Sequence, residues 1–409
     1  MRFARDLALF ALLLPSLPAL AQPKIELPPE DPRSAIPKPA AIDLPRESQI
    51  GVPLDDHPMS GTALGGYGEI VLNAPDDTQP TTIDVRRLVL YVGHNFTEKL
   101  RFYGELEMEH AVTSSTDRGE TEVEQAFIDY LAYRWLNLRA GLIIMPVGIV
   151  NQEHEPPTFN GADRPDTDLY IIPTTWREVG AGVFGAIGPF RYQLYGVTGF
   201  DAHRFSADGL REGHQEGQFA RAHSWAGVAR LDCLPFAGAD IGVSGYVGGA
   251  GQGDAAIGAA PVTLVEADAR LRWKGLEVRA EFANVWVGNT TQLNAELYPD
   301  GGGGAFVARQ MRGGYGEVGY DVLRPWKSKL KYASSLVAFG RYERTDTQAE
   351  VVGHDRAAGH DREATTGGLN FRPIAELALK LDYQRRSIDV EGAPRHGWNQ
   401  VNLGLGWMF

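Results

Sequence analysis

Two short motifs in the sequence suggest known chemistry, but neither has the surroundings that its chemistry needs. Residues 180–185 match the G-x-G-x-x-G spacing of a dinucleotide-binding loop, which must lead directly into a helix. A Gly-Pro turn and another alternating stretch follow, so glycines on a packed strand are the better interpretation. His154-Glu155 begins the zinc motif H-E-x-x-H, but Thr158 replaces the second histidine and Pro156-Pro157 would break its helix. We therefore predict no cofactor, no metal site and no catalytic residue.

The segment from Pro146 to Thr175 holds the charges that we expect to matter most. It separates two strand-like runs, 137–145 and 176–185, and its prolines at 156, 157, 165 and 173 prevent a long helix or a central strand. Irregular loops of this length are usually functional, and a loop facing only solvent would not need its apolar residues. We predict that it folds inward and narrows the bore of a membrane β-barrel. The candidate gate residues are Glu153, His154, Glu155, Asp163, Arg164, Asp166, Asp168 and Tyr170.

Apolar and charged residues alternate with period two along many stretches, most clearly in Lys99–His110. Successive side chains of a strand point to opposite faces, so one face of such a strand is apolar and the other charged. The same alternation returns in 265–273, 276–283 and 379–386. A soluble antiparallel sheet also alternates, so the number and spacing of the strands must decide.

The chain contains about sixteen alternating runs, each long enough for a tilted strand to cross the hydrocarbon layer. An even number suits a closed antiparallel barrel, and tight turns alternate with long polar loops such as 199–221, 288–304 and 345–363. We predict an all-β transmembrane barrel with strands near 62–73, 82–93, 99–111, 122–133, 137–146, 175–185, 190–199, 222–233, 239–249, 262–273, 276–286, 310–321, 331–344, 364–372, 377–387 and 398–409.

The charged faces of these strands should line the lumen. The facing of Arg86–Tyr91 stays open, because neither parity is clearly apolar. For every charge the alternative role is pairing that only holds the loop in place, and for Arg139 and Glu178 the two roles are equally plausible. The predicted pore-lining residues are Arg101, Tyr103, Glu105, Glu107, Glu109, Arg139, Glu178, Arg230, Glu266, Asp268, Arg270, Arg272, Arg279, Glu281 and Arg341.

The first sixty residues differ from the rest of the chain. Residues 1–21 have the basic start, apolar core and small-residue cleavage site of a signal peptide. Residues 22–60 are rich in proline, and we predict a largely disordered periplasmic segment before the barrel of residues 61–409. The formal charge of −13 argues against a nucleic-acid partner. We expect the protein in the bacterial outer membrane.

A family resemblance adds to this interpretation. Ala126–Tyr130, Arg139-Ala140-Gly141 and Pro146-Val147-Gly148, followed by the long loop, resemble the fourth strand, fifth strand and third loop of the phosphate-selective porin O and P family. The resemblance implies a homotrimer of sixteen-stranded channels with an inward third loop. Phosphate selection in that family depends on a ladder of arginines and a cluster of lysines. Acidic residues outnumber basic ones on the faces assigned inward here, so phosphate specificity does not carry over.

The sequence thus predicts a porin rather than an enzyme. Small hydrophilic solutes would diffuse passively through a water-filled pore in contact with outer-membrane lipid, with a mild cation preference or none. A structural or adhesive barrel with a plugged lumen, binding a surface partner through its exterior loops, is the main alternative. A barrel enzyme with a hidden Ser, His and acid set is a third possibility.

Overall fold

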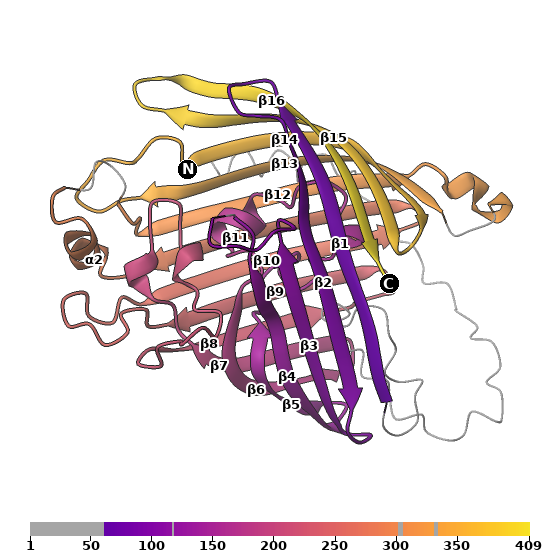
Figure 1. The fold of residues 1–409 in the computed structure, drawn as a ribbon, viewed down its shortest axis with the longest axis horizontal. Coiled ribbons are helices and arrows are strands. Elements are labelled where there is room, and N and C mark those ends of the chain that lie inside the picture. The colour runs from indigo at the N-terminus through magenta and orange to yellow at the C-terminus, as the bar shows by residue number, and fades with distance from the viewer. Residues whose placement is uncertain (1–60, 117, 302–305, 331–333) are drawn as a thin grey trace, which may run out of the picture. The chain divides into compact units, whose positions relative to one another are not determined.

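The described residues form a closed barrel of antiparallel strands. A computed structural model describes residues 61–116, 118–301, 306–330 and 334–409. Each strand hydrogen-bonds to its neighbours in the chain, and β1 pairs with β16 to close the ring, as Figure 1 shows. The predicted all-β barrel of sixteen strands is confirmed. The predicted signal peptide and the proline-rich segment lie outside the described residues.

The strands follow the sequence pattern closely. The first eight are β1 (Gly61–Pro75), β2 (Thr82–Asn95), β3 (Leu100–Glu109), β4 (Thr121–Tyr133), β5 (Leu136–Ile144), β6 (Arg177–Ile187), β7 (Phe190–Thr198) and β8 (Trp225–Cys233). The others are β9 (Ala239–Gly248), β10 (Val262–Trp273), β11 (Leu276–Val287), β12 (Gln310–Asp321), β13 (Ser335–Glu350), β14 (Asp361–Ile374), β15 (Leu377–Val390) and β16 (Ala393–Met408). The helical elements are α2 (Thr290–Leu297), a π-helix at Thr167–Ile171, and 3-10 helices at Pro156–Thr158, Ala202–Arg204, Arg211–Gly213 and Arg324–Lys329.

The two faces of the strands carry opposite chemistry, in the predicted sense. On β3, Glu105 and Glu107 are buried while Leu106 between them is 49% exposed. The barrel therefore has a charged interior and an apolar exterior, the reverse of a soluble sheet in water. Large apolar side chains that are exposed on the outer wall include Leu90, Ile128, Leu138, Leu194, Val243, Leu381 and Leu403. Among the described residues, no helix is both long and apolar enough to cross a bilayer.

Two β-bulges change which side chains face the lumen. In the pairing of β1 with β2, Glu69 opposes Arg87 and Ile70 opposes Val85, so Arg86 is an extra residue. In the pairing of β3 with β4 the register likewise skips Glu124. A bulge lets two successive residues point to the same side, which explains why sequence parity left the facing of Arg86–Tyr91 open. Both bulges add charged groups to the interior.

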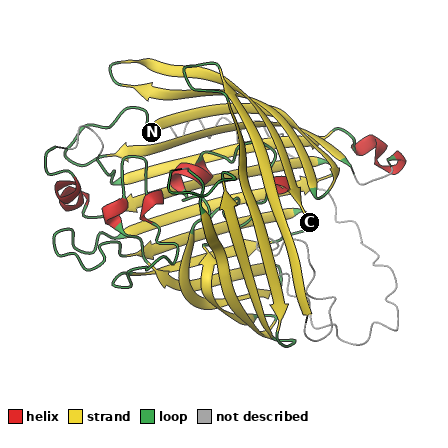
Figure 2. Cartoon of the chain, viewed as in Figure 1, coloured by secondary structure: helices red, strands yellow, loops and turns green. Residues whose placement is uncertain are grey.

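The links between strands divide by length, as Figure 2 shows. One end of the barrel has tight turns, apart from the longer link 322–334, and the other end has most of the long loops and α2. The strands on the loop end run further than predicted: β13 continues to Glu350 and β14 begins at Asp361, so the predicted loop 345–363 is too long. Similarly, β16 begins at Ala393 and not at 398. These extensions are polar on both faces and show no alternation, so hydropathy could not reveal them.

The long loops build an apolar cluster at their end of the lumen. The ring of Trp176 lies 4.9 Å from that of Phe200 and 5.0 Å from that of Tyr246, between ring centroids. Leu293 of α2 and Val307 belong to the same buried cluster. We call these five residues the apolar cap. Its members belong to the part of the chain from the start of β6 to the start of β12, so the apolar cap lies on that side of the barrel.

Candidate functional site: the lumen and loop three

The segment between β5 and β6, residues 146–175, is loop three of the barrel and folds into the lumen. Its two ends are held together by Asn151. The side-chain amide of Asn151 donates to the carbonyl oxygen of Met145 (2.9 Å) and accepts from the backbone N–H of Trp176 (2.8 Å). The chain therefore enters and leaves the lumen at one point of the wall, and the rest of the loop is free to cross the bore.

Loop three reaches opposite sides of the barrel. Arg87 on β2 donates a hydrogen bond to the carbonyl oxygen of His154. Arg270 on β10 forms an ion pair with Glu153, the preceding residue. Since β2 and β10 are eight positions apart in a ring of sixteen strands, they lie across the bore from each other. The loop thus bridges the lumen instead of lining one side of it.

The second half of the loop is attached to the wall near β15. One guanidinium nitrogen of Arg386 lies 2.7 and 2.8 Å from the two carboxylate oxygens of Asp166, which is 3% exposed. The ammonium group of Lys380 donates to the carbonyl oxygen of Gly161 at 2.8 Å. Buried charges are stable only when they are paired and hydrogen-bonded, so these contacts fix the path of the loop.

Several predicted pore-lining charges pair within the wall. Arg139 and Arg101 share Asp129, at 2.8 and 3.4 Å. Glu178 accepts hydrogen bonds from the hydroxyl of Thr198 (2.8 Å) and the N–H of Gln215 (3.1 Å), so it holds the loop between β7 and β8. Neither Arg139 nor Glu178 pairs with loop three, contrary to the loop-pairing alternative.

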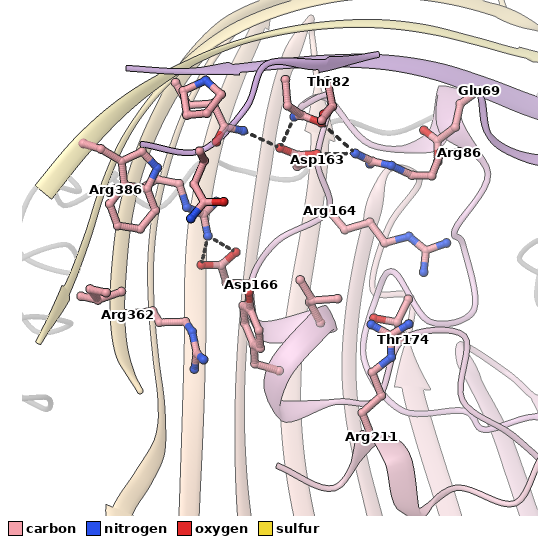
Figure 3. Close-up of a pocket in the computed structure, with 18 of the residues that line it drawn as sticks. Glu69, Thr82, Arg86, Asp163, Arg164, Asp166, Thr174, Arg211, Arg362 and Arg386 are labelled. Atoms are coloured by element: carbon pink, nitrogen blue, oxygen red, sulfur yellow. Dashed lines mark hydrogen bonds and ion pairs between the residues drawn. The ribbon is translucent and has the colours of Figure 1, made fainter. Parts of the chain in front are cut away.

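A water-accessible cavity of about 660 Å³ lies on the loop side of the lumen, next to β1, β2 and β14–β16. Figure 3 shows arginines from different elements around it. We call this cavity the vestibule. Its labelled lining residues are Glu69, Thr82, Arg86, Asp163, Arg164, Asp166, Thr174, Arg211, Arg362 and Arg386.

The charges of the vestibule are only partly paired. Arg86 forms an ion pair with Asp163 (2.8 Å), and Arg386 pairs with Asp166. Arg164 donates to the hydroxyl of Thr175 at 3.1 Å. Within the described part of the chain, no carboxylate forms an ion pair with Arg164 or with the exposed Arg211. The vestibule therefore presents guanidinium groups that can attract anions.

The loop between β7 and β8 closes one edge of the vestibule. Its Asp208 accepts from Arg362 on β14 at 2.9 Å and lies 3.3 Å from Nδ1 of His360. The hydrogen bond from His360 is the main cause that lowers the pKa of Asp208 to about 2. Asp208 is thus ionised at any physiological pH, and its ion pair with Arg362 persists throughout that range.

The predicted site residues fall into four groups. Asp163, Arg164, Asp166 and Tyr170 of the loop line the vestibule together with Glu109 of the wall. Glu153, His154, Glu155 and Asp168 lie against the wall; of these, His154, Glu155 and Asp168 are buried. Arg270 is half-buried and Arg272 is exposed beside the turn after β10. The wall residues buried in the interior are Arg101, Tyr103, Glu105, Glu107, Arg139, Glu178, Arg230, Glu266, Asp268, Arg279, Glu281 and Arg341.

The sequence interpretation missed several arginines of the vestibule. Arg86 and Arg87 were unassigned because the bulge beside them is not visible in the sequence. Arg211 and Arg362 were counted with the exterior loops, whereas the structure folds them over the lumen. No local pattern distinguishes an arginine in such a loop from one in solvent.

Comparison with known proteins gives a family and a fold. No family model matches the chain. An uncharacterized protein of Aquifex aeolicus (strain VF5) is 35% identical over 334 residues, which cover 80% of this chain and 76% of that one. The chain belongs to the same family as that protein.

Solved structures similar to the barrel are outer-membrane proteins. The outer membrane channel DcaP of Acinetobacter baumannii has a TM-score of 0.56 at 11% identity, covering 86% of this chain and 98% of that one. OmpF of Salmonella typhi has a TM-score of 0.55 at 10% identity, covering 85% of this chain and 97% of that one. An anion-selective porin from Comamonas acidovorans has a TM-score of 0.51 at 10% identity, covering 86% of this chain and 100% of that one. At such identity the likeness is one of fold. It supports the porin fold in general rather than the phosphate-selective O and P family, and with the apolar outer wall it places the chain in the bacterial outer membrane.

Proposed function

We propose that the protein is a porin, through which small hydrophilic solutes diffuse passively past loop three. The observation that carries this proposal is the charged vestibule of about 660 Å³, located across the barrel from the apolar cap. Loop three would set the bore, because it bridges the lumen between Arg87 and Arg270. Polar walls and fixed charges favour hydrated solutes and disfavour apolar ones.

We expect weak charge selectivity. The acidic residues Glu105 and Glu107 are nearly inaccessible to water, whereas Arg164 and Arg211 line the vestibule. Ion selectivity depends on the charges that a permeating ion can approach. A count of all acidic and basic residues in the lumen includes buried acids, and it therefore overestimates the attraction for cations. The mild cation preference predicted from the sequence is therefore opposed by the vestibule, and a reversal potential near zero should result.

Single-channel recording in planar bilayers tests the constriction. The full-length barrel should give stable conductance steps, and a variant lacking Asn151–Asp168 should give larger ones. A matched deletion of residues 112–116, in an exposed loop, should leave the steps unchanged. Equal conductance of the wild type and the loop-three deletion would show that loop three does not set the bore.

A plugged structural or adhesive barrel is a second candidate, and one observation favours it. Loop three crosses the whole bore and its contacts at Glu153 and Asp166 are largely shielded from water. Together with the apolar cap, these contacts could leave no continuous passage. The same recordings discriminate: a plugged wild type gives no steps, while the loop-three deletion opens the barrel.

We also propose a homotrimer. The resemblance of residues 126–148 to the phosphate-selective porin O and P family supports it. The outer wall over β4–β6 supports it as well, since Ile128, Leu138 and Val183 surround a shallow groove floored by small residues such as Ala140. Light scattering of the detergent-solubilised protein measures the assembly. A monomer that persists in several detergents and in native lipid would contradict the proposal.

A further inference from the structure

Three side chains from separate segments meet deep in the wall of the lumen. They are Glu105 of β3, Glu124 of β4 and His154 of loop three, and they are 3%, 0% and 1% exposed. One potential ligand atom from each lies within 4.8 Å of the others. Throughout the described ranges, this is the one group of three or more His, Cys, Asp or Glu residues with such spacing.

The imidazole of His154 is oriented as a metal ligand. Its Nδ1 lies 3.0 Å from the backbone carbonyl oxygen of Asn151, so Nδ1 carries a proton and donates it there. The other nitrogen, Nε2, faces Oε1 of Glu124 at 2.8 Å. A histidine whose Nδ1 is bound to a backbone carbonyl offers its Nε2 lone pair to a metal, which is the usual arrangement of ligating histidines.

The two carboxylates are also held in place by hydrogen-bond donors. The hydroxyl of Tyr103 donates to Glu105 at 2.7 Å, and the amide of Gln125 donates to its second oxygen. The hydroxyl of Tyr67 donates to Oε2 of Glu124 at 3.1 Å. Oε1 of Glu124 is fully buried and lies 2.8 Å from Nε2 of His154, and the hydroxyl oxygen of Tyr67 lies 2.8 Å from the same nitrogen. Without a metal, a proton on Nε2 joins His154 to Glu124; a metal ion would take the place of that proton and bind the same two atoms.

The local charge balance favours the same conclusion. Glu107 and Glu155, 2% and 3% exposed, add further buried carboxylates near Glu105 and Glu124. The nearby guanidinium of Arg87 is already paired with Glu69 at 3.1 Å. Arg164 and Arg177 are also close enough to act on Glu124, and Arg177 is paired with Glu122. Buried carboxylates need compensating positive charge, and here the acids outnumber the guanidinium groups.

We propose that Glu105, Glu124 and His154 bind a divalent first-row transition-metal ion of the zinc type. An imidazole ligand favours such ions over calcium and magnesium, which prefer all-oxygen shells. The sequence predicted no metal site, because the H-E-x-x-H motif at His154 is incomplete and Glu105 and Glu124 lie far from it in the chain. The ion would pin the first half of loop three to β3 and β4, as Arg386 pins the second half to β15.

Metal titration of the full chain in detergent tests the site directly. After treatment with EDTA, the protein should bind one equivalent of Zn²⁺ by calorimetry, and Co²⁺ should produce visible absorption bands of a nitrogen-containing site. Glu124→Gln and His154→Ala should each weaken Zn²⁺ binding at least about 100-fold, since loss of an outer partner alone costs about 10–100-fold. Asp168→Asn is the matched control: this buried loop carboxylate lies beside Glu281, without a histidine, and its loss should leave binding unchanged.

Other outcomes overturn the proposal. These are absence of Zn²⁺ binding, wild-type affinity in His154→Ala, or Ca²⁺ affinity equal to that for Zn²⁺. Heat-modifiable gel mobility verifies folding, and if a ligand variant fails to fold, Tyr103→Phe should still weaken Zn²⁺ binding about 10-fold by releasing Glu105. The titration does not depend on conductance: a barrel that binds Zn²⁺ but passes no ions would refute the porin and leave the metal site standing.

Discussion

The contact between Arg386 and Asp166 allows a quantitative test of how loop three is held. The perturbation is a double-mutant cycle with Arg386→Gln and Asp166→Asn. The carboxylate side chain is 4% exposed and the guanidinium side chain 15%, with both oxygens within 2.8 Å of one nitrogen. Removing one partner of a buried pair costs about 3–5 kcal/mol. Because water still reaches Arg386, we expect the lower value, about 3 kcal/mol.

The cycle isolates the pair itself. Asp166→Asn keeps a hydrogen-bond acceptor, so it should cost about 2 kcal/mol, and the double variant about 3 kcal/mol. The expected coupling is therefore about 2 kcal/mol. If loop three detaches from the wall as a whole, no variant can lose more unfolding free energy than the free energy that holds the loop in the lumen. A double variant that costs no more than one single variant would therefore also reveal the size of that free energy.

Urea unfolding of the barrel in lipid vesicles, followed by tryptophan fluorescence, measures these free energies by linear extrapolation. The control cycle uses Arg309 and Glu350, an ion pair of 3.1 Å whose side chains are 57% and 47% exposed. Exposed pairs contribute about 0–1 kcal/mol, so its coupling should be below about 0.5 kcal/mol. Equal couplings in both cycles would refute the claim that Asp166 is anchored in a shielded lumen.

Three further predictions concern the vestibule, the exterior loops and the lipid-facing wall. Arg164→Glu should shift the reversal potential under a salt gradient toward cation selectivity, and the exposed Arg309→Glu should not; an unchanged potential in both would remove Arg164 from the ion path. Burial lowers the pKa of His203, but its hydrogen bonds to Asp201 and Asp254 outweigh burial and leave the pKa raised. The ion pair of His203 with Asp254, which joins the β7–β8 loop to the β9–β10 loop, is therefore complete at acidic pH and lost as pH rises through the raised pKa. Proteolysis of these two loops should accelerate at alkaline pH, and His203→Gln should abolish that pH dependence. Leu90→Arg, halfway along β2, should destabilise the barrel by about 2–4 kcal/mol, against about 0–1 kcal/mol for an arginine near the membrane boundary.

The sequence alone determined the barrel and the location of its unusual loop. Alternation along β3 and β10 assigned the facing of Glu105 and Glu266 correctly, because the side-chain period of a strand is a local property. The prolines and charges of residues 146–175 marked loop three for the same reason. Strand ends were less certain at the loop ends of β13 and β14, since the residues there are polar on both faces and no alternation remains.

Only the tertiary structure decided which charges meet water and which meet each other. One bulged residue brings Arg86 into the vestibule and another brings Glu124 toward His154, and a bulge leaves no mark in composition or periodicity. Glu124 and His154 are thirty residues apart, and Arg386 and Asp166 are joined across 220 positions of the chain. Closure of the ring and the path of loop three create these contacts. A sequence pattern records the environment of each residue along its own strand, whereas the partners of a side chain inside a barrel depend on how the whole ring closes.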